Sequence, residues 1–340
     1  MHRRVNLTRR NDVYFLPVVA SLALVALSLR ATPSPRVHLF PKLSPGETLR
    51  YQIETRISSN SKMETPIENP EAASKSKQTV SLILRLDILN PLPANTDPPG
   101  SVRIRATYEK SSATFETDAY DPAGANIAEQ YKNLEGRSLE YSIDPDGRLS
   151  HTAGVDDLLA NPSVAENARL WMNGLSSGAR VPKAGIEIGQ KWSSESPIQG
   201  VALGGLIWRN QSTYLRDEPC YSTDGPPKSP PVAQPVDTNV SCAVIVTQFK
   251  INRNGDTTPD DYARQNLDTS GTWTGSGGSL ESVSLSTGIL IRSTQNSTEN
   301  MDVDIASRRS GSKLHFAGHI ESHSEILLLP AATLPVQPQP

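Results

Sequence analysis

Alternation of apolar and polar residues along much of the chain is the feature that most restricts its fold. Leu49, Tyr51 and Ile53 alternate with polar neighbours, and the runs at 80–88 and 102–108 follow the same period. A period of two places apolar side chains on one face of a β-strand and polar side chains on the other. We therefore predict strands with one face on a core and one face in water, as in antiparallel sheets.

Further strands are predicted near residues 203–215, 242–251, 271–285, 289–295, 301–306 and 313–329. Residues 58–77 lie between the first two runs; they are polar and show no period, which predicts a long loop. The sequence Asp-Pro-Asp-Gly at 144–147 predicts a hairpin turn, because proline presets one turn dihedral and glycine accepts the next. Ser286-Thr287-Gly288 predicts a second hairpin.

The two hairpin neighbourhoods resemble each other. Ser138–Glu140 and Ser279–Glu281 both read Ser-Leu-Glu and precede the glycine of their turn by the same offset. One interpretation is a duplication that gives related halves at 37–153 and 186–325. The other is chance similarity between two serine-rich hairpins.

One segment departs from the strand pattern. Asn161 caps and Pro162 opens a predicted helix over 162–175, within a connecting segment at 155–178. Its apolar stripe must be covered by something apolar. The stripe comprises Val164, Ala168, Trp171 and Leu175. We predict a mainly β fold, in which a curved antiparallel sheet or half-barrel packs around this one helix.

The N-terminus has the layout of a secretory signal. Four arginines, at positions 3, 4, 9 and 10, precede an apolar stretch at 13–29. Residues 1–31 are therefore either a cleaved signal peptide or an anchor in the inner membrane. We expect a periplasmic or extracellular protein whose β-rich domain covers 37–325. The proline-rich residues 330–340 are expected to remain an unfolded tail.

Charge argues against a nucleic-acid partner. The formal net charge is −3, and five of the 33 basic residues but only one of the 36 acidic residues lie within 1–31, so the rest of the chain carries −7. No basic cluster occurs beyond the predicted signal. Binding to nucleic acid depends on such clusters because it releases counterions from phosphates.

The chain contains two cysteines, Cys220 and Cys242. In an oxidising compartment the expected state of such a pair is a disulfide, which here would close a proline-rich loop. The alternative is two separate buried thiols.

The best candidate for a metal site lies near the C-terminus. On a strand, His319, Glu321 and His323 share one face, and residues two apart are close enough to bind one ion. The alternative is an ordinary solvated strand face. Neither a catalytic nucleophile motif nor a cofactor motif is present, so no catalytic residue and no cofactor are predicted.

Two tryptophans occur in or after the predicted helix. Trp171 belongs to its stripe, and Trp192 follows it along the chain. Together with Val164, Ala168 and Leu175 they either anchor the helix on the sheet or line a pocket for an apolar ligand.

The order of these features resembles that of known proteins. A helix, the step Val181-Pro182 and then Gly189-Gln190-Lys191-Trp192 entering further strands are similar to a class of uncharacterised exported bacterial β proteins, over residues 43–325. A sheet wrapped around a helix resembles, more loosely, the half-barrel of periplasmic lipoprotein carriers. That resemblance implies a concave surface that shelters acyl chains, and it transfers no site residue.

Three functional hypotheses follow. The first is a non-catalytic exported envelope protein that binds an apolar small molecule, a lipid or a partner protein. The second is a metal-binding protein or metal-dependent enzyme that uses the C-terminal histidines and glutamate. The third is a structural or surface-interaction domain without a ligand.

Overall fold

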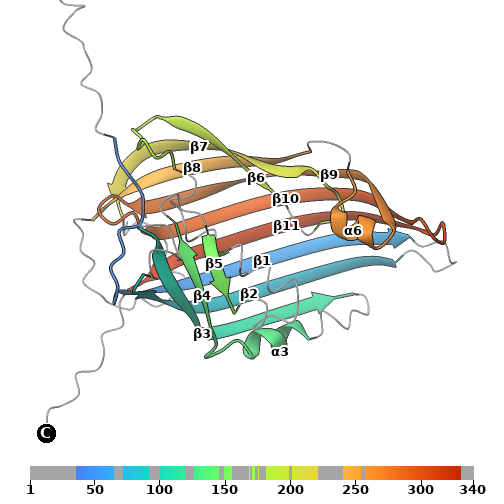
Figure 1. Ribbon diagram of the computed structural model, residues 1–340, viewed down its shortest axis with the longest axis horizontal. Helices are drawn as coiled ribbons and strands as arrows, with labels where there is room; N and C mark the ends of the chain where they lie inside the picture. The colour runs from blue at the N-terminus through green and yellow to red at the C-terminus, as the bar shows by residue number, and fades with distance from the viewer. Residues whose placement is uncertain are drawn as a thin grey trace, which may run out of the picture. The chain divides into compact units, whose positions relative to one another are not determined.

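The computed structural model describes residues 36–64, 72–91, 100–118, 126–144, 149–154, 168, 171, 172, 175, 181–198, 201–220, 240–253 and 257–330 (Figure 1). All of them belong to one unit that begins at Arg36. The elements within these residues are β1 (Thr48–Glu64), β2 (Ala72–Leu89), β3 (Val102–Thr117), α3 (Ile127–Lys132), β4 (Ser138–Ile143), β5 (Leu149–Ala153), β6 (Lys191–Pro197), β7 (Leu206–Pro219), β8 (Ser241–Arg253), α6 (Asp260–Arg264), β9 (Leu267–Ser284), β10 (Leu290–Ser307) and β11 (Lys313–Leu329).

The strands form one antiparallel sheet in the order β5-β4-β3-β2-β1-β11-β10-β9-β8-β7-β6. In this sheet β1 pairs with β11, from Arg50 opposite Leu329 to Glu64 opposite His315. Every other pairing joins strands that follow one another along the chain. The first and last strands therefore lie in the middle of the sheet, while β5 and β6 form its two edges. The predicted mainly β, antiparallel fold is confirmed.

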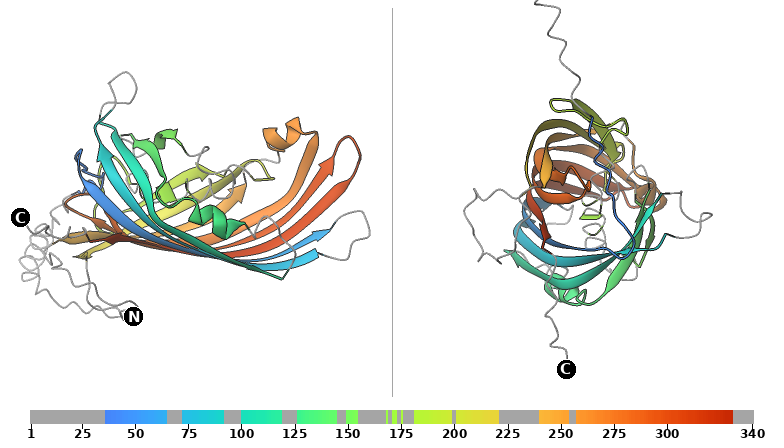
Figure 2. Two further views of the ribbon diagram at one scale, coloured as in Figure 1. Left: turned by 90° about the horizontal axis from the view of Figure 1, so that it is seen from below. Right: turned by 90° about the vertical axis from the view of Figure 1, so that its left-hand side faces the viewer.

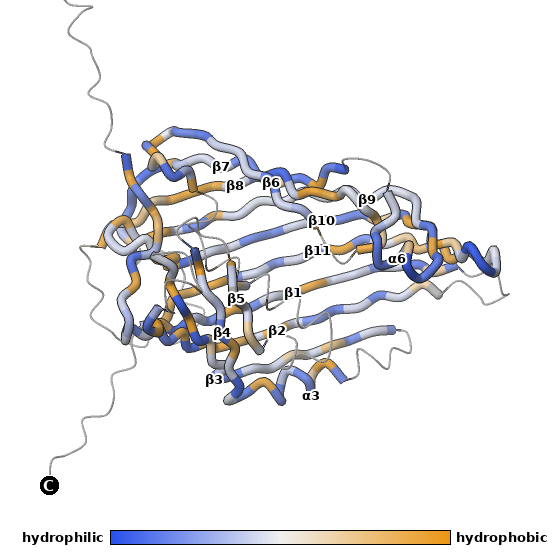
Figure 3. Tube along the Cα trace, in the orientation of Figure 1, coloured by the Kyte–Doolittle hydropathy of each residue, from blue (hydrophilic) through white to orange (hydrophobic). Residues whose placement is uncertain are grey.

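The register divides the sheet into two faces. Tyr51 and Ile53 of β1 lie opposite Leu84 and Leu82 of β2, and all four side chains are almost completely buried. Figure 2 shows the sheet curling around this face, which we call the inner face. The other, outer face carries polar side chains, so hydrophobic and hydrophilic positions alternate along the strands in Figure 3.

The main hydrophobic core fills one end of the inner face. It combines buried side chains of β1–β4 with the four described residues of the predicted helix, Ala168, Trp171, Met172 and Leu175. These four residues are helical and at most 7% exposed. The helix and its burial against the sheet agree with the predicted stripe, whose remaining member, Val164, lies outside the described residues.

A second, smaller cluster lies at the other end of β8–β10, near α6. Its buried members are Leu203, Leu206, Ile251 and Val303, with the half-buried Trp208, Trp273 and Met301 packed against them. Between the two clusters the inner face is largely polar. The candidate site described below lies in this intermediate region.

A segment before β1 covers the strand ends at the core side. Val37 forms a bridge with Ile186, and the backbone N–H of Lys42 donates to the carbonyl of Thr287. Gly288, in the predicted β9–β10 turn, has a φ of +67°, and a Cβ at this position would lie 2.2 Å from the carbonyl oxygen of Phe40. Glycine is therefore required here both by the turn and by the close approach of the segment.

The prediction of a loop over residues 58–77 is wrong at both ends of this range. β1 continues to Glu64 and β2 begins at Ala72, so only 65–71 lie outside the described strands. Apart from Met63 and its partner Ala72, the described inner positions of this stretch are small hydroxyl side chains, such as Ser59 opposite Ser76. Because neither face is apolar, the hydrophobic period disappears, while backbone pairing with β11 and β3 continues the strands.

The predicted break between 295 and 301 is also wrong. Residues Asn296–Asn300 continue β10 as a strand, paired on both sides with β9 and β11. The hairpin at 286–288 is confirmed by the pairing of β9 with β10. The strands flanking the predicted turn at 144–147 pair as well, although residues 145–148 lie outside the described part.

The predicted disulfide is present. Cys220 and Cys242 are joined, with Cα atoms 4.9 Å apart. The predicted signal and tail lie outside the described residues. Of the helices in the described part of the chain, none is long and apolar enough to cross a membrane.

Candidate functional site

The residues predicted to line a ligand pocket are largely part of the main core. The ring of Trp171 is 4% exposed and packs edge-on against Tyr108 and Tyr141, with ring centroids 6.2 and 6.4 Å apart. Burial in this cluster raises the pKa of Tyr108 to about 12. Trp192, at the start of β6, is half-buried against the same core. These contacts are those of anchors, and a ligand-lining role for the group stays a prediction.

The residues predicted to bind a metal lie on the outer face of β11. His319 Nδ1 is 2.8 Å from Asn300 Oδ1 and His323 Nδ1 is 2.8 Å from Asn296 Oδ1, each amide being the direct register partner on β10. His319 Nε2 is 3.4 Å from Glu321 Oε1. Each imidazole is thus held separately by an asparagine of the neighbouring strand.

His319 and Glu321 border an outer-face groove of about 460 Å³, which also includes Lys75 and Lys77. Nowhere in the described ranges do three or more His, Cys, Asp or Glu side chains converge as metal ligands. Metal binding by His319, Glu321 and His323 stays a prediction. Metal analysis of the purified protein and of His319→Ala tests it.

Charge is divided between the two faces of the sheet. The register places every basic residue of β1, β2, β3, β10 and β11 at an outer position, and β9 has none. These residues are Arg50, Arg56, Lys62, Lys75, Lys77, Arg85, Arg103, Arg105, Lys110, Arg292, Lys313, His315, His319 and His323. Two acidic residues of the same six strands, Glu281 and Glu299, have inner positions.

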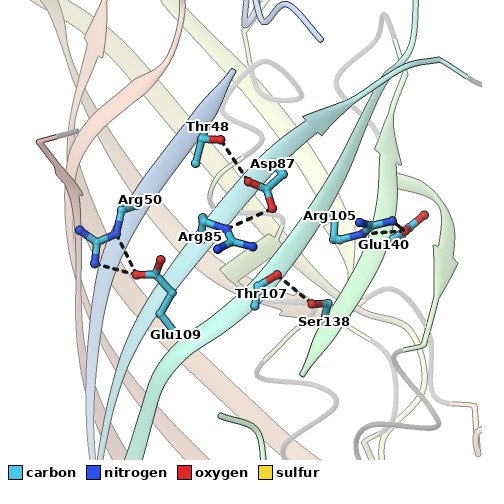
Figure 4. A network of polar contacts seen from close by, with 9 residues as sticks. All are labelled: Thr48, Arg50, Arg85, Asp87, Arg105, Thr107, Glu109, Ser138 and Glu140. Carbon is cyan, nitrogen blue, oxygen red and sulfur yellow. Dashed lines mark hydrogen bonds and ion pairs between the residues drawn. The ribbon is translucent and has the colours of Figure 1, made fainter. Parts of the chain in front are cut away.

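Outer charges are paired across strands, as Figure 4 shows for β1–β4. Arg50 of β1 reaches across β2 to Glu109 of β3, at 2.6 Å, and Arg105 of β3 contacts Glu140 of β4 at 2.8 Å. Ion pairs of this kind belong to a solvated surface and contribute little individually. The outer face therefore accounts for most of the charge of these strands.

The exposure of the inner-face side chains increases along β1. Tyr51 and Ile53 are 2% exposed, the next inner positions are half-buried, and Met63 near the end of the strand is 44% exposed. Thr55 and Ile57 stand at the transition. The strands thus continue well beyond the core, and their inner side chains there are only partly covered.

Partly covered apolar side chains gather on this continuation. Ile57 of β1 lies opposite Gln78 of β2, which lies opposite Phe115 of β3, so all three share one row across the sheet. Ile320 of β11 occupies the next row, opposite Ser59. We call the half-buried residues Ile57, Phe115, Phe316 and Ile320 the open apolar surface.

On β1 and β11 a row of polar side chains separates the open apolar surface from the main core, while on β2 and β3 this row is formed by the core residues Val80 and Ala113. It crosses six strands in direct register: Thr55, Ser324, Gln295, Ser279, Thr247 and Ser212. Neighbouring hydroxyl groups in this row form hydrogen bonds with one another. Ser212 Oγ is 2.8 Å from Thr247 Oγ1, and Thr55 Oγ1 is 3.3 Å from Ser324 Oγ. This polar row therefore has internal hydrogen-bond partners where it borders the apolar core.

Glu299 is the inner acid nearest the open apolar surface, because it lies directly opposite Ile320. Its Oε2 accepts a hydrogen bond of 3.0 Å from the indole Nε1 of Trp273. Burial raises the pKa of Glu299, and the indole hydrogen bond offsets part of that effect. Sequence reasoning missed Glu299, although its parity with Met301 and Val303 places it on the apolar side of β10.

Comparisons with known proteins leave the family open. No family model and no curated protein matches the chain. Among solved structures, one of lipid–protein interactions in lipovitellin matches with 13% identity and a TM-score of 0.40, over 88% of this chain and 27% of that one. The chain thus spans about a quarter of the lipovitellin chain.

Two bacterial structures also match. A DUF1329 family protein from Desulfovibrio piger has 8% identity and a TM-score of 0.14, over 83% of this chain and 87% of that one. The COG4313 outer membrane channel from Pseudomonas putida F1 has 6% identity and a TM-score of 0.19, over 85% and 98%. Scores this low do not establish a shared function.

Proposed function

We propose that this chain is a non-catalytic, exported binding protein whose inner sheet face holds an apolar ligand. The ligand would lie on the open apolar surface, beyond the polar row. The observation that carries the proposal is the partial exposure of large apolar side chains on the curled face. Ile57, Phe115 and Ile320 lie on two neighbouring rows, and Phe316 lies two inner positions beyond Ile320 on β11, opposite Met63.

The energetic reason is the cost of leaving such side chains in water. Apolar surface removed from water contributes about 25 cal/mol per Å², so each side chain that becomes fully covered adds favourable free energy to binding. Concave, mainly apolar surfaces with a few polar groups are the usual form of small-molecule sites. The polar row and Glu299 supply those polar groups.

Export is supported by two features. The arginines followed by the apolar stretch at 13–29 have the layout of a secretory signal. The disulfide between Cys220 and Cys242 suits an oxidising compartment. A non-catalytic role is proposed because the carboxylate of the site, Glu299, accepts its hydrogen bond from the indole of Trp273 rather than from a hydroxyl nucleophile.

The proposal is tested with a neutral fluorescent probe, N-phenyl-1-naphthylamine, displaced by dodecanol. We expect Ile320→Ser to weaken dodecanol binding about fivefold to tenfold, since about 1.4 kcal/mol corresponds to one factor of ten. The matched control is Leu327→Ser on the same strand, because Leu327 is 41% exposed on the outer face. Equal effects of both substitutions, or no binding of either compound, would refute the proposal.

A partner protein is the alternative occupant of this surface. Dodecanol would then fail to displace the probe, whereas a partner from the cell envelope would protect Ile320 and Phe316 from solvent. The displacement experiment therefore separates a small apolar ligand from a protein partner.

A further inference from the structure

The inner face of the central strands has an uneven charge. Within the described parts of β1, β2, β3, β9, β10 and β11, it carries two carboxylates, Glu281 and Glu299, and no basic side chain. On β8 the basic residue Arg253 has an inner position, but its Nη1 donates to the carbonyl of Gly271, at 2.6 Å, near the second cluster. A ligand on this face therefore meets negative charge without a compensating cation from these strands.

Glu281 and Glu299 differ in their surroundings. Glu281 is 9% exposed, borders the main core and accepts a hydrogen bond from Ser279. Glu299 is half-buried and lies between Ile320 of β11 and Gly275 of β10's other neighbour, β9. Of the two acids, Glu299 is thus the one whose register partner, Ile320, belongs to the open apolar surface.

Gly275 allows Glu299 to lie flat against the second cluster. A Cβ on Gly275 would be 3.0 Å from Glu299 Cγ and 2.8 Å from Ile251 Cδ1, so both side chains occupy the space above the glycine. The side chain of Glu299 therefore lies toward β9, beside Ile251 and the indole of Trp273, while its register partner on the other side is Ile320. It combines a partly dehydrated negative charge with an adjacent aromatic ring.

The carboxylate of Glu299 can accept more hydrogen bonds than the indole of Trp273 donates. An ionised carboxylate offers about four acceptor positions, and Trp273 donates one hydrogen bond. Burial disfavours the charged form unless a cation or further donors approach it. The influences that act on the Glu299 pKa, burial and the indole hydrogen bond, include no cationic side chain.

We propose that Glu299 and Trp273 hold the ammonium group of an amphiphilic ligand whose apolar part lies on the open apolar surface. The carboxylate provides a charge-assisted hydrogen bond, and the indole provides a cation–π contact. This inference rests on the proposed function and specifies the ligand class of the same site, a cationic amphiphile.

The placement of the apolar part follows from the register. Ile320 is opposite Glu299, and Ile57 and Phe115 follow on β1 and β3, with neighbouring strands about 4.8 Å apart. A chain that starts at Glu299 and runs diagonally across β11 and β1 would pass Ile320 and then Ile57, which lies one inner row nearer the main core; Phe115 lies on the row of Ile57. Its head would remain beside Trp273.

The test compares three probes with the same alkyl chain: dodecylamine, dodecanol and dodecanoate, each below its micelle concentration at pH 7.5. Affinities are measured by displacement of N-phenyl-1-naphthylamine from the full exported chain. We expect dodecylamine to bind about tenfold more tightly than dodecanol, and dodecanoate to bind least well.

Glu299→Gln should remove the preference for the amine, so that the ratio of amine to alcohol affinity falls from about ten to about one. The matched control is Glu321→Gln, which changes the same functional group on the outer face of β11 and should keep the preference. The wild-type ratio of amine to alcohol is itself a test that needs no variant, so a folding defect in Glu299→Gln leaves the inference falsifiable.

The outcomes are distinguishable. Binding of dodecanol without preference for the amine, or a preference that survives Glu299→Gln, would overturn the ammonium site and leave the apolar-ligand function standing. Failure of all three compounds to bind would overturn both. A preference lost in Glu299→Gln and kept in Glu321→Gln supports the site.

Discussion

The indole of Trp273 donates a 3.0 Å hydrogen bond to the carboxylate of Glu299, linking inner positions of two adjacent strands, β9 and β10. Trp273 belongs to the second cluster, whereas Glu299 lies opposite Ile320 of the open apolar surface. The pair therefore joins a packed region of the sheet to a partly exposed one. Its position makes it the most informative place to probe both stability and binding.

Glu299→Gln should stabilise the ligand-free protein at neutral pH. Burial raises the pKa of Glu299 above its ordinary value of 4.5, so the folded state binds the proton more tightly than the unfolded state. Wild-type stability consequently falls as pH rises from that ordinary value through the folded pKa. Urea unfolding at pH 7.5 should show a higher midpoint for the variant, and the difference should vanish below pH 4.5. A lower midpoint at pH 7.5 would show that the charged form is favoured.

Trp171→Ala should destabilise the fold strongly. The ring is 4% exposed and packs edge-on against Tyr108 and Tyr141, and truncation of buried aromatic residues costs about 3–5 kcal/mol. Chemical unfolding measures the loss, and Trp171→Phe should recover much of it. A loss below about 1 kcal/mol for Trp171→Ala would mean that this ring is not a core anchor.

Gly277→Ala should be far more damaging than Gly278→Ala. A Cβ at Gly277 would lie 2.1 Å from the carbonyl oxygen of Asn296 and 2.5 Å from a ring carbon of Phe249, whereas a Cβ at Gly278 comes no closer than 3.2 Å to Thr247. Overpacking of this kind costs about 1–3 kcal/mol or more.

Urea unfolding of the two glycine variants provides an internally matched comparison, because the residues are adjacent on β9 and face opposite sides. We expect Gly278→Ala to change stability by less than about 1 kcal/mol. Similar losses in both variants would mean that Phe249 does not fill the space beside Gly277.

Reduction of the disulfide should lower stability by about 3 kcal/mol, the chain-entropy value for closing a loop of this size. Cys220 and Cys242 are 22 positions apart, so the bond restricts the unfolded chain. Thermal unfolding with and without reductant measures the effect. The double variant Cys220→Ser with Cys242→Ser should unfold like the reduced protein and be insensitive to reductant; an unchanged transition on reduction would contradict the prediction.

The strands with alternating apolar residues were predictable because burial on one face leaves a period of two in the sequence. Leu49, Tyr51 and Ile53 are a clear case, and their register partners on β2 show the same period. The helix stripe was predictable for a similar reason, since Ala168, Trp171 and Leu175 repeat at helical spacing and are buried. The cysteine pair needed only the count of two and the expectation of an oxidising compartment.

The extensions of β1, β2 and β10 were not predictable in this way. Ser59, Ser61 and Ser76 point inward but are as polar as their outer neighbours, so no hydrophobic period marks them. These segments are strands because the neighbours on both sides supply backbone partners. One of these neighbours is distant in sequence. β1 lies beside β11, whose residues are more than 250 positions away.

The sequence by itself determined the alternation, the helical stripe and the segregation of charge by parity, because each depends on the order of residues along a single strand or helix. Tertiary structure decided which strands are neighbours, and so which inner side chains share a row. Pairing of the first strand with the last brings Ile57 diagonally across from Ile320. Pairing of β10 with β11 places Glu299 opposite Ile320, and Trp273 lies on the adjoining strand β9. The physical reason is that a side chain's neighbours across a sheet are set by backbone hydrogen bonding between distant segments, which leaves no local pattern in the chain.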